Sequence, residues 1–247
     1  MRVVAIIQAR LGSTRLPGKV LLPLAGEPML ARVMERVRRA KKIHEVAVAT
    51  TTAASDDDLA AICAERQWPI YRGSEMDVLD RYVQAAHAFS ADAIMRITSD
   101  CPVIDPDVLD EVVTEFLAQQ PKTDYLANIL PQRTFPRGLD AELIRRDVLE
   151  RCHAEAADSW SREHVTAFIY QHPDRFHLAG LTAPEDYSQH RWTVDTPEDL
   201  ALIEKIYDHF GHSDFSWRET LALVDAHPEW MEINHHVQQK MPSNQHS

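Results

Sequence analysis

The hydrophobic pattern of the chain alternates between short apolar runs and longer segments in which apolar residues recur at helical spacing. Residues 3–7 form an unbroken apolar run rich in β-branched side chains, which predicts a strand buried on both faces of a parallel sheet. Similar runs predict further strands at residues 46–50, 68–71, 93–97, 125–129, 139–144, 176–181 and 191–194. Because helical patterns separate most of these strands, we expect an α/β fold in which helices flank a mostly parallel central sheet.

Residues that favour helix initiation mark the helix starts. Helices are predicted at 29–42 after Pro28, from Ser55 to residue 66, at 78–89, at 106–120 after Asp105, from about Ser161, from Pro197 after the cap Thr196, and at 217–225. The cations near the end of the 29–42 helix are interpreted chiefly as partners of the helix dipole, with a binding patch as the alternative. No linker interrupts the pattern, so residues 1–231 are predicted to form a single domain. The Gln-, Asn- and His-rich residues 232–247 predict a disordered tail.

Composition excludes several classes of partner. The formal net charge of −12 argues against a nucleic-acid partner, which would require a basic face. Three widely spaced cysteines, Cys63, Cys101 and Cys152, fit neither a disulfide framework nor a zinc site, and they favour a reducing, cytoplasmic location. No apolar run approaches membrane length and no secretory leader is recognised, so we expect no membrane association.

A polar loop with three cations follows the first strand directly. Residues 8–19 read QARLGSTRLPGK, so Arg10, Arg15 and Lys19 alternate with Gly12 and Gly18. Glycines let backbone amides approach a ligand, and the cations can converge on it, which predicts a triphosphate site; an ordinary turn is the alternative. The loop is not a Walker A motif, because a valine follows the lysine where that motif has Ser or Thr, and it lacks the G-x-G-x-x-G fingerprint.

Two aspartates follow predicted strands and are candidates for metal chemistry. Asp100 lies after the 93–97 strand, at the sheet edge where α/β proteins bind ligands, and it is predicted to carry Mg²⁺ to a phosphate. A helix N-cap is the alternative for Asp100, but Asp105 fits that role better. Near residue 195, helix initiation explains Glu198 and Asp199 and leaves Asp195 unexplained, at a strand end like Asp100.

Several of these motifs together resemble those of a known enzyme family. Residues 8–19, with GEPM at 26–29, resemble the nucleotide-binding signature of cytidylyltransferases that make CMP-activated sugar acids, the CMP-Kdo and acylneuraminate synthetases. The strings RGSE at 72–75, DVLDRY at 77–82 and SREHVT at 161–166 are most similar to the spore coat polysaccharide biosynthesis protein F family. The resemblance runs from residue 1 to about residue 210. It implies a Rossmann-like fold of the GT-A, nucleotide-diphospho-sugar transferase type.

The resemblance assigns expected roles to residues of this chain. The expected nucleotide-binding residues are Gln8, Ala9, Arg10, Gly12, Ser13, Arg15, Lys19, Arg72, Gly73, Ser74 and Asp100. Asp195 is implied as the second Mg²⁺ ligand beside Asp100, although Ser99 stands where the related enzymes have glycine. For the acceptor, Arg137 is expected to hold a carboxylate, Asp140 a hydroxyl, and Glu163 and His164 to contribute. A plain turn at 72–74 or 136–138 and a structural histidine at 164 are the alternatives.

The function implied is Mg²⁺-dependent transfer of CMP from CTP to a sugar acid, with a nonulosonate as one candidate, for surface polysaccharide synthesis. Lys19, Arg10, Asp100 and Asp195 are the expected catalytic groups, and a homodimer is implied. The Kdo-recognising segment is not matched, so Kdo itself is not expected. A sugar-1-phosphate nucleotidylyltransferase or glycosyltransferase on the same fold is one alternative. A non-catalytic nucleotide-binding protein is the other.

Overall fold

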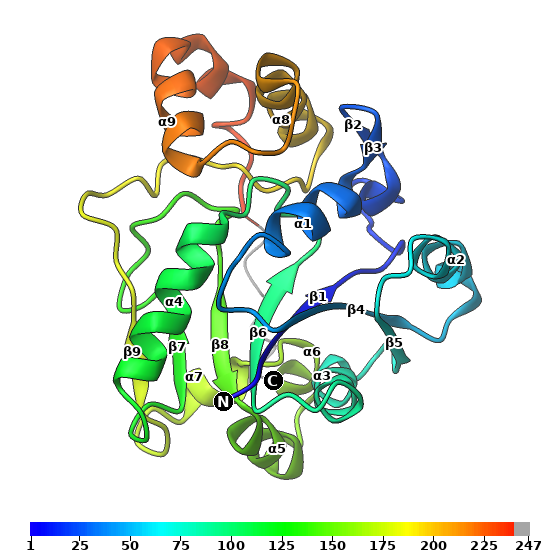
Figure 1. The fold of residues 1–247 in the computed structure, drawn as a ribbon, viewed down its shortest axis with the longest axis vertical. Coiled ribbons are helices and arrows are strands. Elements are labelled where there is room, and N and C mark those ends of the chain that lie inside the picture. The colour runs from blue at the N-terminus through cyan, green and yellow to red at the C-terminus, as the bar shows by residue number, and fades with distance from the viewer. Residues whose placement is uncertain (240–247) are drawn as a thin grey trace.

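The computed structural model describes residues 1–239, and it consists of a central sheet with helices packed on both faces (Figure 1). Seven strands lie in the order β5-β4-β1-β6-β8-β7-β9. Their bounds are β1 Val3–Gln8, β4 Glu45–Thr51, β5 Ile70–Gly73, β6 Ala93–Thr98, β7 Tyr125–Ala127, β8 Glu142–Arg145 and β9 Leu178–Gly180. Only β8 runs against its neighbours in this sheet, and the remaining pairings are parallel. The predicted mostly parallel sheet is therefore confirmed.

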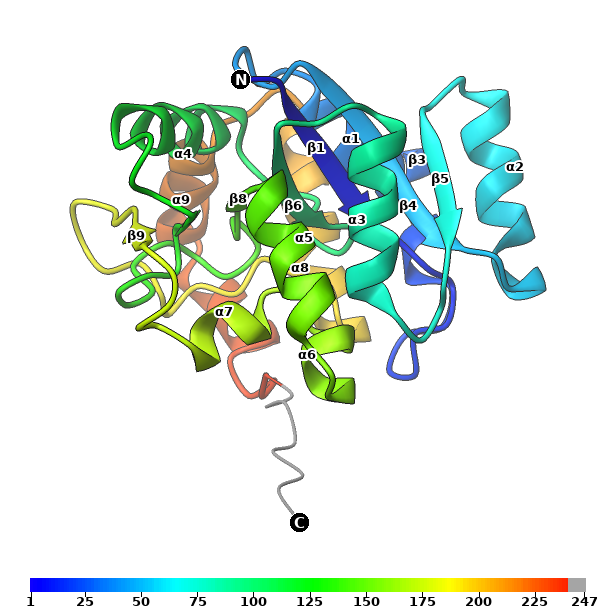
Figure 2. The same ribbon diagram turned by 90° about the horizontal axis from the view of Figure 1, so that it is seen from below.

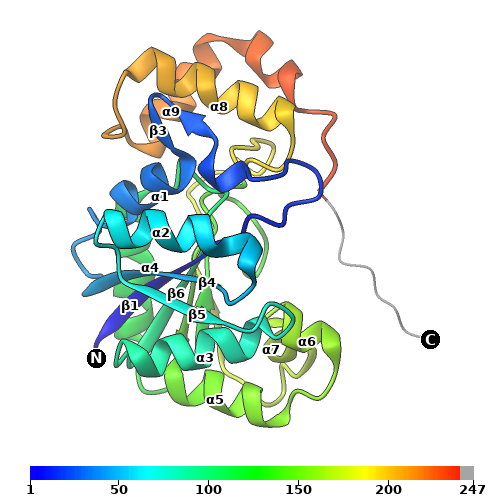
Figure 3. The same cartoon turned by 90° about the vertical axis from the view of Figure 1, so that its right-hand side faces the viewer.

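Alternate residues of β1 face the two helical layers, as the period of two along a strand requires. Val3, Ala5 and Ile7 pack into the apolar cluster that contains α1, α2 and α4, whereas Val4 and Ile6 pack against α3, α5 and α7. Figure 3 shows α1 and α2 on one side of the sheet and α3 and α5 on the other, and Figure 2 shows α5 and α6 beside α3. These helices are α1 Met29–Val37, α2 Asp57–Glu65, α3 Val78–Ala88, α4 Pro106–Ala118, α5 Arg146–Glu155, α6 Ser159–Glu163 and α7 Ala167–Gln171.

A third apolar cluster holds the C-terminal helices against the first hairpin. Helices α8 Pro197–Phe210 and α9 Trp217–Ala226 lie at the top of Figure 1, near the hairpin of β2 Pro23–Leu24 and β3 Glu27–Pro28. The fully buried Trp192 belongs to this cluster, three residues before Asp195. The cluster therefore fixes the segment that leads into α8. No helix within residues 1–239 is long and apolar enough to cross a bilayer.

The predicted strand at 191–194 is wrong. This segment makes one isolated bridge, between Arg191 and Arg137, and then crosses to a different partner. The amide of Trp192 donates to the carbonyl of Arg137 at 2.7 Å, whereas the amide of Val194 donates to the carbonyl of Asp100 at 2.8 Å. Since its hydrogen bonds go to two loops, the segment ties those loops together and does not extend the sheet.

Several helix predictions also differ from the structure. Helix α1 ends at Val37, five residues early, and Ser55 lies inside the 3-10 helix Ala54–Asp56 and does not cap α2. The helix predicted from Ser161 is two short helices, α6 and α7, with Val165 between them at φ 53°. Helix α5 was not predicted. The caps at Asp105 and Thr196 are confirmed, because both side chains accept hydrogen bonds from amides of the first helical turn.

The first residues of the predicted tail lie beside the C-terminal helices. A 3-10 helix, Pro228–Ile233, follows α9, and the next residue, Asn234, is only 3% exposed. Residues 240–247, the rest of the predicted tail, lie outside the described residues.

Arg36 shows that the basic end of α1 has a structural role. Its buried guanidinium donates to the carbonyls of Ile104 and Ser213 at 2.6 Å, Phe215 at 2.9 Å and Val103 at 3.3 Å. It thereby joins α1 to the loop before α4 and to the loop before α9. A buried carbonyl that loses its donor costs free energy, so four such bonds make Arg36 a structural anchor.

Replacing Arg36 by Met should lower the free energy of unfolding by about 3 kcal/mol, because the apolar stem is kept while the carbonyls lose their donors. Urea unfolding followed by circular dichroism measures this change. The matched control is Arg38→Met, since Arg38 is exposed on the same helix end. Equal stability of the two variants would contradict the anchoring role.

Candidate active site

The site lies where the strand order reverses, at the carboxyl ends of β1 and β6. Gln8 at the end of β1 is paired with Thr98 at the end of β6, while β4 flanks β1 on its other side. Loops diverge at such a point and leave a crevice, which is where open α/β sheets bind ligands. A pocket of about 290 Å³ occupies the crevice, and its lining residues are Gln8, Arg10, Gly12, Ser13, Thr14, Arg15, Lys19, Val20, Thr98, Ser99 and Asp100.

The loop after β1 is folded back on itself by backbone contacts. The amide of Gly18 donates to the carbonyl of Leu11 at 3.1 Å, and Gly18 has φ 68°, a left-handed conformation that favours glycine. Asp56 anchors the same loop, since its carboxylate accepts from the amide of Leu11 at 2.7 Å. The loop therefore has a defined shape that turns Lys19 into the pocket.

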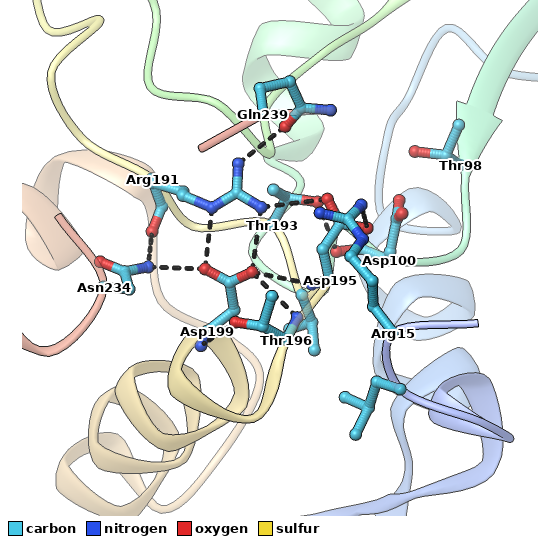
Figure 4. Close-up of polar contacts among 12 residues, drawn as sticks. Arg15, Thr98, Asp100, Arg191, Thr193, Asp195, Thr196, Asp199, Asn234 and Gln239 are labelled. Atoms are coloured by element: carbon cyan, nitrogen blue, oxygen red, sulfur yellow. Dashed lines mark hydrogen bonds and ion pairs between the residues drawn. The ribbon is translucent and has the colours of Figure 1, made fainter. Parts of the chain in front are cut away.

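Lys19 joins the two predicted metal-binding aspartates, Asp100 and Asp195, both of which are labelled in Figure 4. Its Nζ lies 2.8 Å from Asp100 Oδ2 and 2.9 Å from Asp195 Oδ1, and it also donates to the carbonyl of Val194 at 2.8 Å. Arg15 adds a second cation, with Nη2 3.0 Å from Asp195 Oδ1. Two carboxylates that are 95 residues apart in the sequence therefore meet beside the cationic loop.

Backbone contacts hold the two aspartates together independently of Lys19. Besides the bond from Val194 to Asp100, the hydroxyl of Thr193 donates to the same Asp100 carbonyl at 3.1 Å. Burial alone would lower the pKa of Lys19, but the carboxylates of Asp100 and Asp195 outweigh burial and raise that pKa. Burial likewise raises the pKa of Asp195, but Lys19, Arg15 and Arg191 outweigh burial and lower it. The lysine stays charged and Asp195 stays ionised.

Asp199 has a larger role than sequence reasoning gave it. It forms a capping box with Thr196, as an acid in the first turn of α8 can, but its fully buried carboxylate also pairs with Arg191. Arg191 in turn contacts Asp195, with Nη2 to Oδ2 at 3.0 Å. Neither Arg191 nor Asp199 is predicted from the sequence as part of the site. Helix initiation accounts for Asp199, and the predicted 191–194 strand accounts for Arg191.

The other predicted nucleotide-binding residues divide into two groups. Among the loop residues, Ala9 does not line the pocket, since it is buried and its amide bonds to Ala49. The predicted nucleotide-binding residues of the second loop, 72–74, are also absent from the pocket lining. Arg72 donates to the carbonyls of Thr51 at 2.8 Å and Ala53 at 3.1 Å, and Ser74 Oγ accepts from the amide of Asp77 at 3.0 Å. These contacts match the structural alternative for the 72–74 turn.

The predicted acceptor segment does not line the pocket, but its Arg137 forms a backbone bridge with Arg191, which contacts Asp195. Its charged residues pair differently from the expectation. Asp140 makes a two-point ion pair with Arg133, one N–O distance being 2.7 Å, so its oxygens already have a partner. The half-buried Arg137, in contrast, has no carboxylate within 4.0 Å among residues 1–239. Gly138 has φ 107°, and an added Cβ would lie 2.6 Å from the Trp192 backbone, so glycine permits the close crossing of the two segments.

Glu163 and His164 lie at the end of α6, on the α3 side of the sheet. The ring of His164 packs on Trp160 with centroids 3.9 Å apart, and burial lowers its pKa. Within the described part of the chain, no hydrogen bond or ion pair links Glu163 or His164 to a pocket residue. Their expected role in acceptor binding stays a prediction.

Comparisons with known proteins identify the family of the chain. A family model described as cytidylyltransferase matches residues 4–226. The spore coat polysaccharide biosynthesis protein SpsF of Bacillus subtilis is 35% identical over 235 residues, which cover 92% of this chain and 95% of that protein.

Solved structures show the same fold. A cytidylyltransferase from Leptospira borgpetersenii superposes with a TM-score of 0.90 and 32% identity, over 98% of this chain and 100% of the other. A CMP:2-keto-3-deoxy-manno-octonic acid synthetase complexed with CTP gives a TM-score of 0.62 at 20% identity, over 85% and 99% of the two chains, which is a likeness of fold alone. The Rossmann-like fold expected from the sequence is confirmed. Because the family model matches most of the chain, and because relatives match it over nearly their full length, the chain belongs to the cytidylyltransferase family and is a nucleotidyltransferase enzyme.

Proposed function

We propose that the protein transfers CMP from CTP to a sugar acid and releases pyrophosphate, in the synthesis of a surface polysaccharide. The observation that carries the proposal is the convergence of Asp100 and Asp195 on Lys19 beside the pocket, with Nζ 2.8 Å from a carboxylate oxygen of Asp100 and 2.9 Å from one of Asp195. Nucleotidyl transfer requires this combination, because cations must neutralise the phosphates while carboxylates hold a divalent ion. CTP as the donor is inferred from family membership, and the SpsF relative supports a polysaccharide product.

The donor set fits Mg²⁺. The carboxylates of Asp100 and Asp195 approach one common cation, Lys19 Nζ, at 2.8 and 2.9 Å, so their oxygens already converge on a site of positive charge. Among residues 1–239, no group of three or more acidic, histidine or cysteine side chains is arranged to bind a metal. Mg²⁺ commonly combines one or two carboxylates with waters and substrate phosphates, so two protein ligands are sufficient.

The chain's own residues divide the work of the reaction. Asp100 and Asp195 would hold the ion, which supplies positive charge at the phosphate and lowers the pKa of the attacking hydroxyl. Arg10, Arg15 and Lys19 hold the triphosphate in the pocket and neutralise the charge that develops on the leaving pyrophosphate. The acceptor hydroxyl oxygen forms a bond to the α-phosphorus and gives up its proton to water. The bond from the α-phosphorus to the oxygen that bridges it to the β-phosphate breaks, and pyrophosphate leaves with that oxygen, so the residues mainly position the reactants in line.

Arg137 is the proposed anchor for the acceptor carboxylate. Burial lowers the pKa of Arg137, and the nearby Arg133 and Arg191 lower it further, which together outweigh the opposite effect of Asp140 and Asp195. A carboxylate bound directly to the Arg137 guanidinium would therefore meet a positive charge that no carboxylate yet pairs among residues 1–239. Asp140, paired with Arg133, then shapes this region together with Glu163 and His164, which are proposed to contact the sugar. A homodimer is proposed as well, and light scattering of the purified protein measures its mass.

The substrate class is tested by incubating the protein with Mg²⁺, each of the four ribonucleoside triphosphates, and panels of sugar acids and sugar 1-phosphates. We expect pyrophosphate release with CTP and a sugar acid, including a nonulosonate. Pyrophosphate release with sugar 1-phosphates and not with any sugar acid would contradict the proposed acceptor class.

Replacing either aspartate by asparagine should reduce kcat by about 100-fold or more, because each change removes a charged ligand where the transition state needs it. Steady-state pyrophosphate release by Asp100→Asn and Asp195→Asn measures the effect. Asp107→Asn is the matched control, since Asp107 is exposed on the first turn of α4 and outside the pocket. Near-normal turnover by either site variant would contradict the assignment of its carboxylate.

Arg137→Met should raise KM for the sugar acid by about 10- to 100-fold and leave the affinity for CTP unchanged, because a charge-assisted two-point contact is lost only for the acceptor. A neutral analogue, in which the acid is reduced to an alcohol, provides the control: the variant and the parent protein should use it equally poorly. An unchanged KM for the acid in the variant would rule out Arg137 as its anchor.

A further inference from the structure

The two carboxylate oxygens of Asp195 face different partners. Oδ1 faces the cationic loop that lines the pocket, where it meets Lys19 at 2.9 Å and Arg15 at 3.0 Å. Oδ2 faces the body of the protein and accepts from Arg191 Nη2 at 3.0 Å. The direction in which Asp195 presents Oδ1 therefore depends on where Arg191 is held. Figure 4 shows the contact between these two side chains.

Asp199 holds Arg191 and the backbone of Asp195 at the same time. Its Oδ1 and Oδ2 accept from Arg191 Nε at 2.8 Å and Nη2 at 3.0 Å, a fork that fixes the guanidinium plane. Oδ2 also accepts from the amides of Asp195 at 2.9 Å and Thr196 at 3.1 Å. Because Asp199 is fully buried, each of its oxygens needs donors, and a lost donor would loosen the cluster.

The C-terminal segment supplies the remaining donor. Asn234 Nδ2 donates to Asp199 Oδ1 and to the carbonyl of Arg191, both at 2.9 Å. Farther along, Gln239 Oε1 accepts from Arg191 Nη1 at 2.7 Å. Asn234 is 3% exposed and lies outside the residues 4–226 that the family model matches.

We propose that Asn234 is a positioning residue for Asp195, so that the segment after α9 completes the active site. Asn234 fixes Arg191 and Asp199, these fix the orientation of the Asp195 carboxylate, and that orientation aims Oδ1 at the proposed metal position. The inference rests on the proposed function, because it assumes that Asp195 is a metal ligand. When a residue that hydrogen-bonds to a metal ligand and orients it is replaced, metal affinity or turnover typically falls by roughly 10- to 100-fold.

A structural role predicts something different. If Asn234 only fastens the C-terminal segment to the body, its loss would lower stability and leave turnover per folded molecule unchanged. If it positions Asp195, its loss lowers kcat and weakens metal binding, whereas CTP binding without metal changes little, since Arg10, Arg15 and Lys19 hold the phosphates. Stability, kcat, metal affinity and CTP affinity must therefore each be measured separately.

The test uses the full chain with Asn234→Leu, which keeps the volume but removes both donors, and Asn234→Ala as a smaller second variant. We expect kcat to fall by roughly 10- to 100-fold and the dissociation constant of Mn²⁺ from the CTP complex to rise by a similar factor. Electron paramagnetic resonance of free Mn²⁺ measures the metal affinity. Calorimetry in EDTA measures CTP affinity, which should stay within about twofold, a change of less than 0.5 kcal/mol.

The matched control is Ile233→Ala. Ile233 packs against the α8–α9 cluster from the same segment, so its truncation loosens the segment without removing a donor to Arg191 or Asp199. It should lower the melting temperature while kcat and Mn²⁺ affinity stay within about twofold, a change of less than 0.5 kcal/mol.

The outcomes separate this inference from the proposed function. If Asp195→Asn is inactive but both folded Asn234 variants keep normal kcat and Mn²⁺ affinity, the positioning role is overturned and the proposed function stands. If Asp195→Asn is fully active, the metal assignment and this inference fall together. Equal losses in Ile233→Ala and Asn234→Leu would also overturn the positioning role, since loosening of the segment would explain both.

Discussion

The contact of Lys19 with Asp100 and Asp195 is the interaction around which the charges of the site are arranged. It joins three parts of the chain, the loop after β1, the turn after β6 and the start of α8. Each charge alone would be costly to bury, and together they compensate one another in a partly buried position. The sheet provides the geometry, because parallel strands bring the ends of β1 and β6 to one edge. The third cluster then brings Asp195 to that edge.

The same need for compensation explains why the charged network extends behind the pocket. Asp195 has one oxygen toward the cationic loop and the other toward Arg191, whose charge is matched by the buried Asp199. The chain that follows α9 closes this network with the amide of Asn234. A carboxylate with donors on both sides has little freedom to rotate, and preorganised charge of this kind is what electrostatic catalysis requires.

Local sequence patterns predicted the parts of this arrangement that depend on local physics. The apolar run at 3–7, the caps at Asp105 and Thr196, and the polar residues at strand ends follow from propensity and periodicity. Pairing between distant segments was not predictable in this way. The 191–194 segment has the composition of a strand, but its amides bond to loops. Likewise, the sequence does not reveal that Arg133 forms an ion pair with Asp140. Nor does it reveal that Asn234, which lies in a polar segment, is buried.

The proposed chemistry requires Asp100 and Asp195 together to bind the divalent ion that contacts the phosphates of CTP. The most direct measurement is the anomalous scattering of Mn²⁺ in crystals of the protein grown with CTP. We expect an anomalous peak within bonding distance of a carboxylate oxygen of each aspartate and of a CTP phosphate oxygen. Mn²⁺ bound to the phosphates alone, with Lys19 still between the two carboxylates, would contradict this expectation.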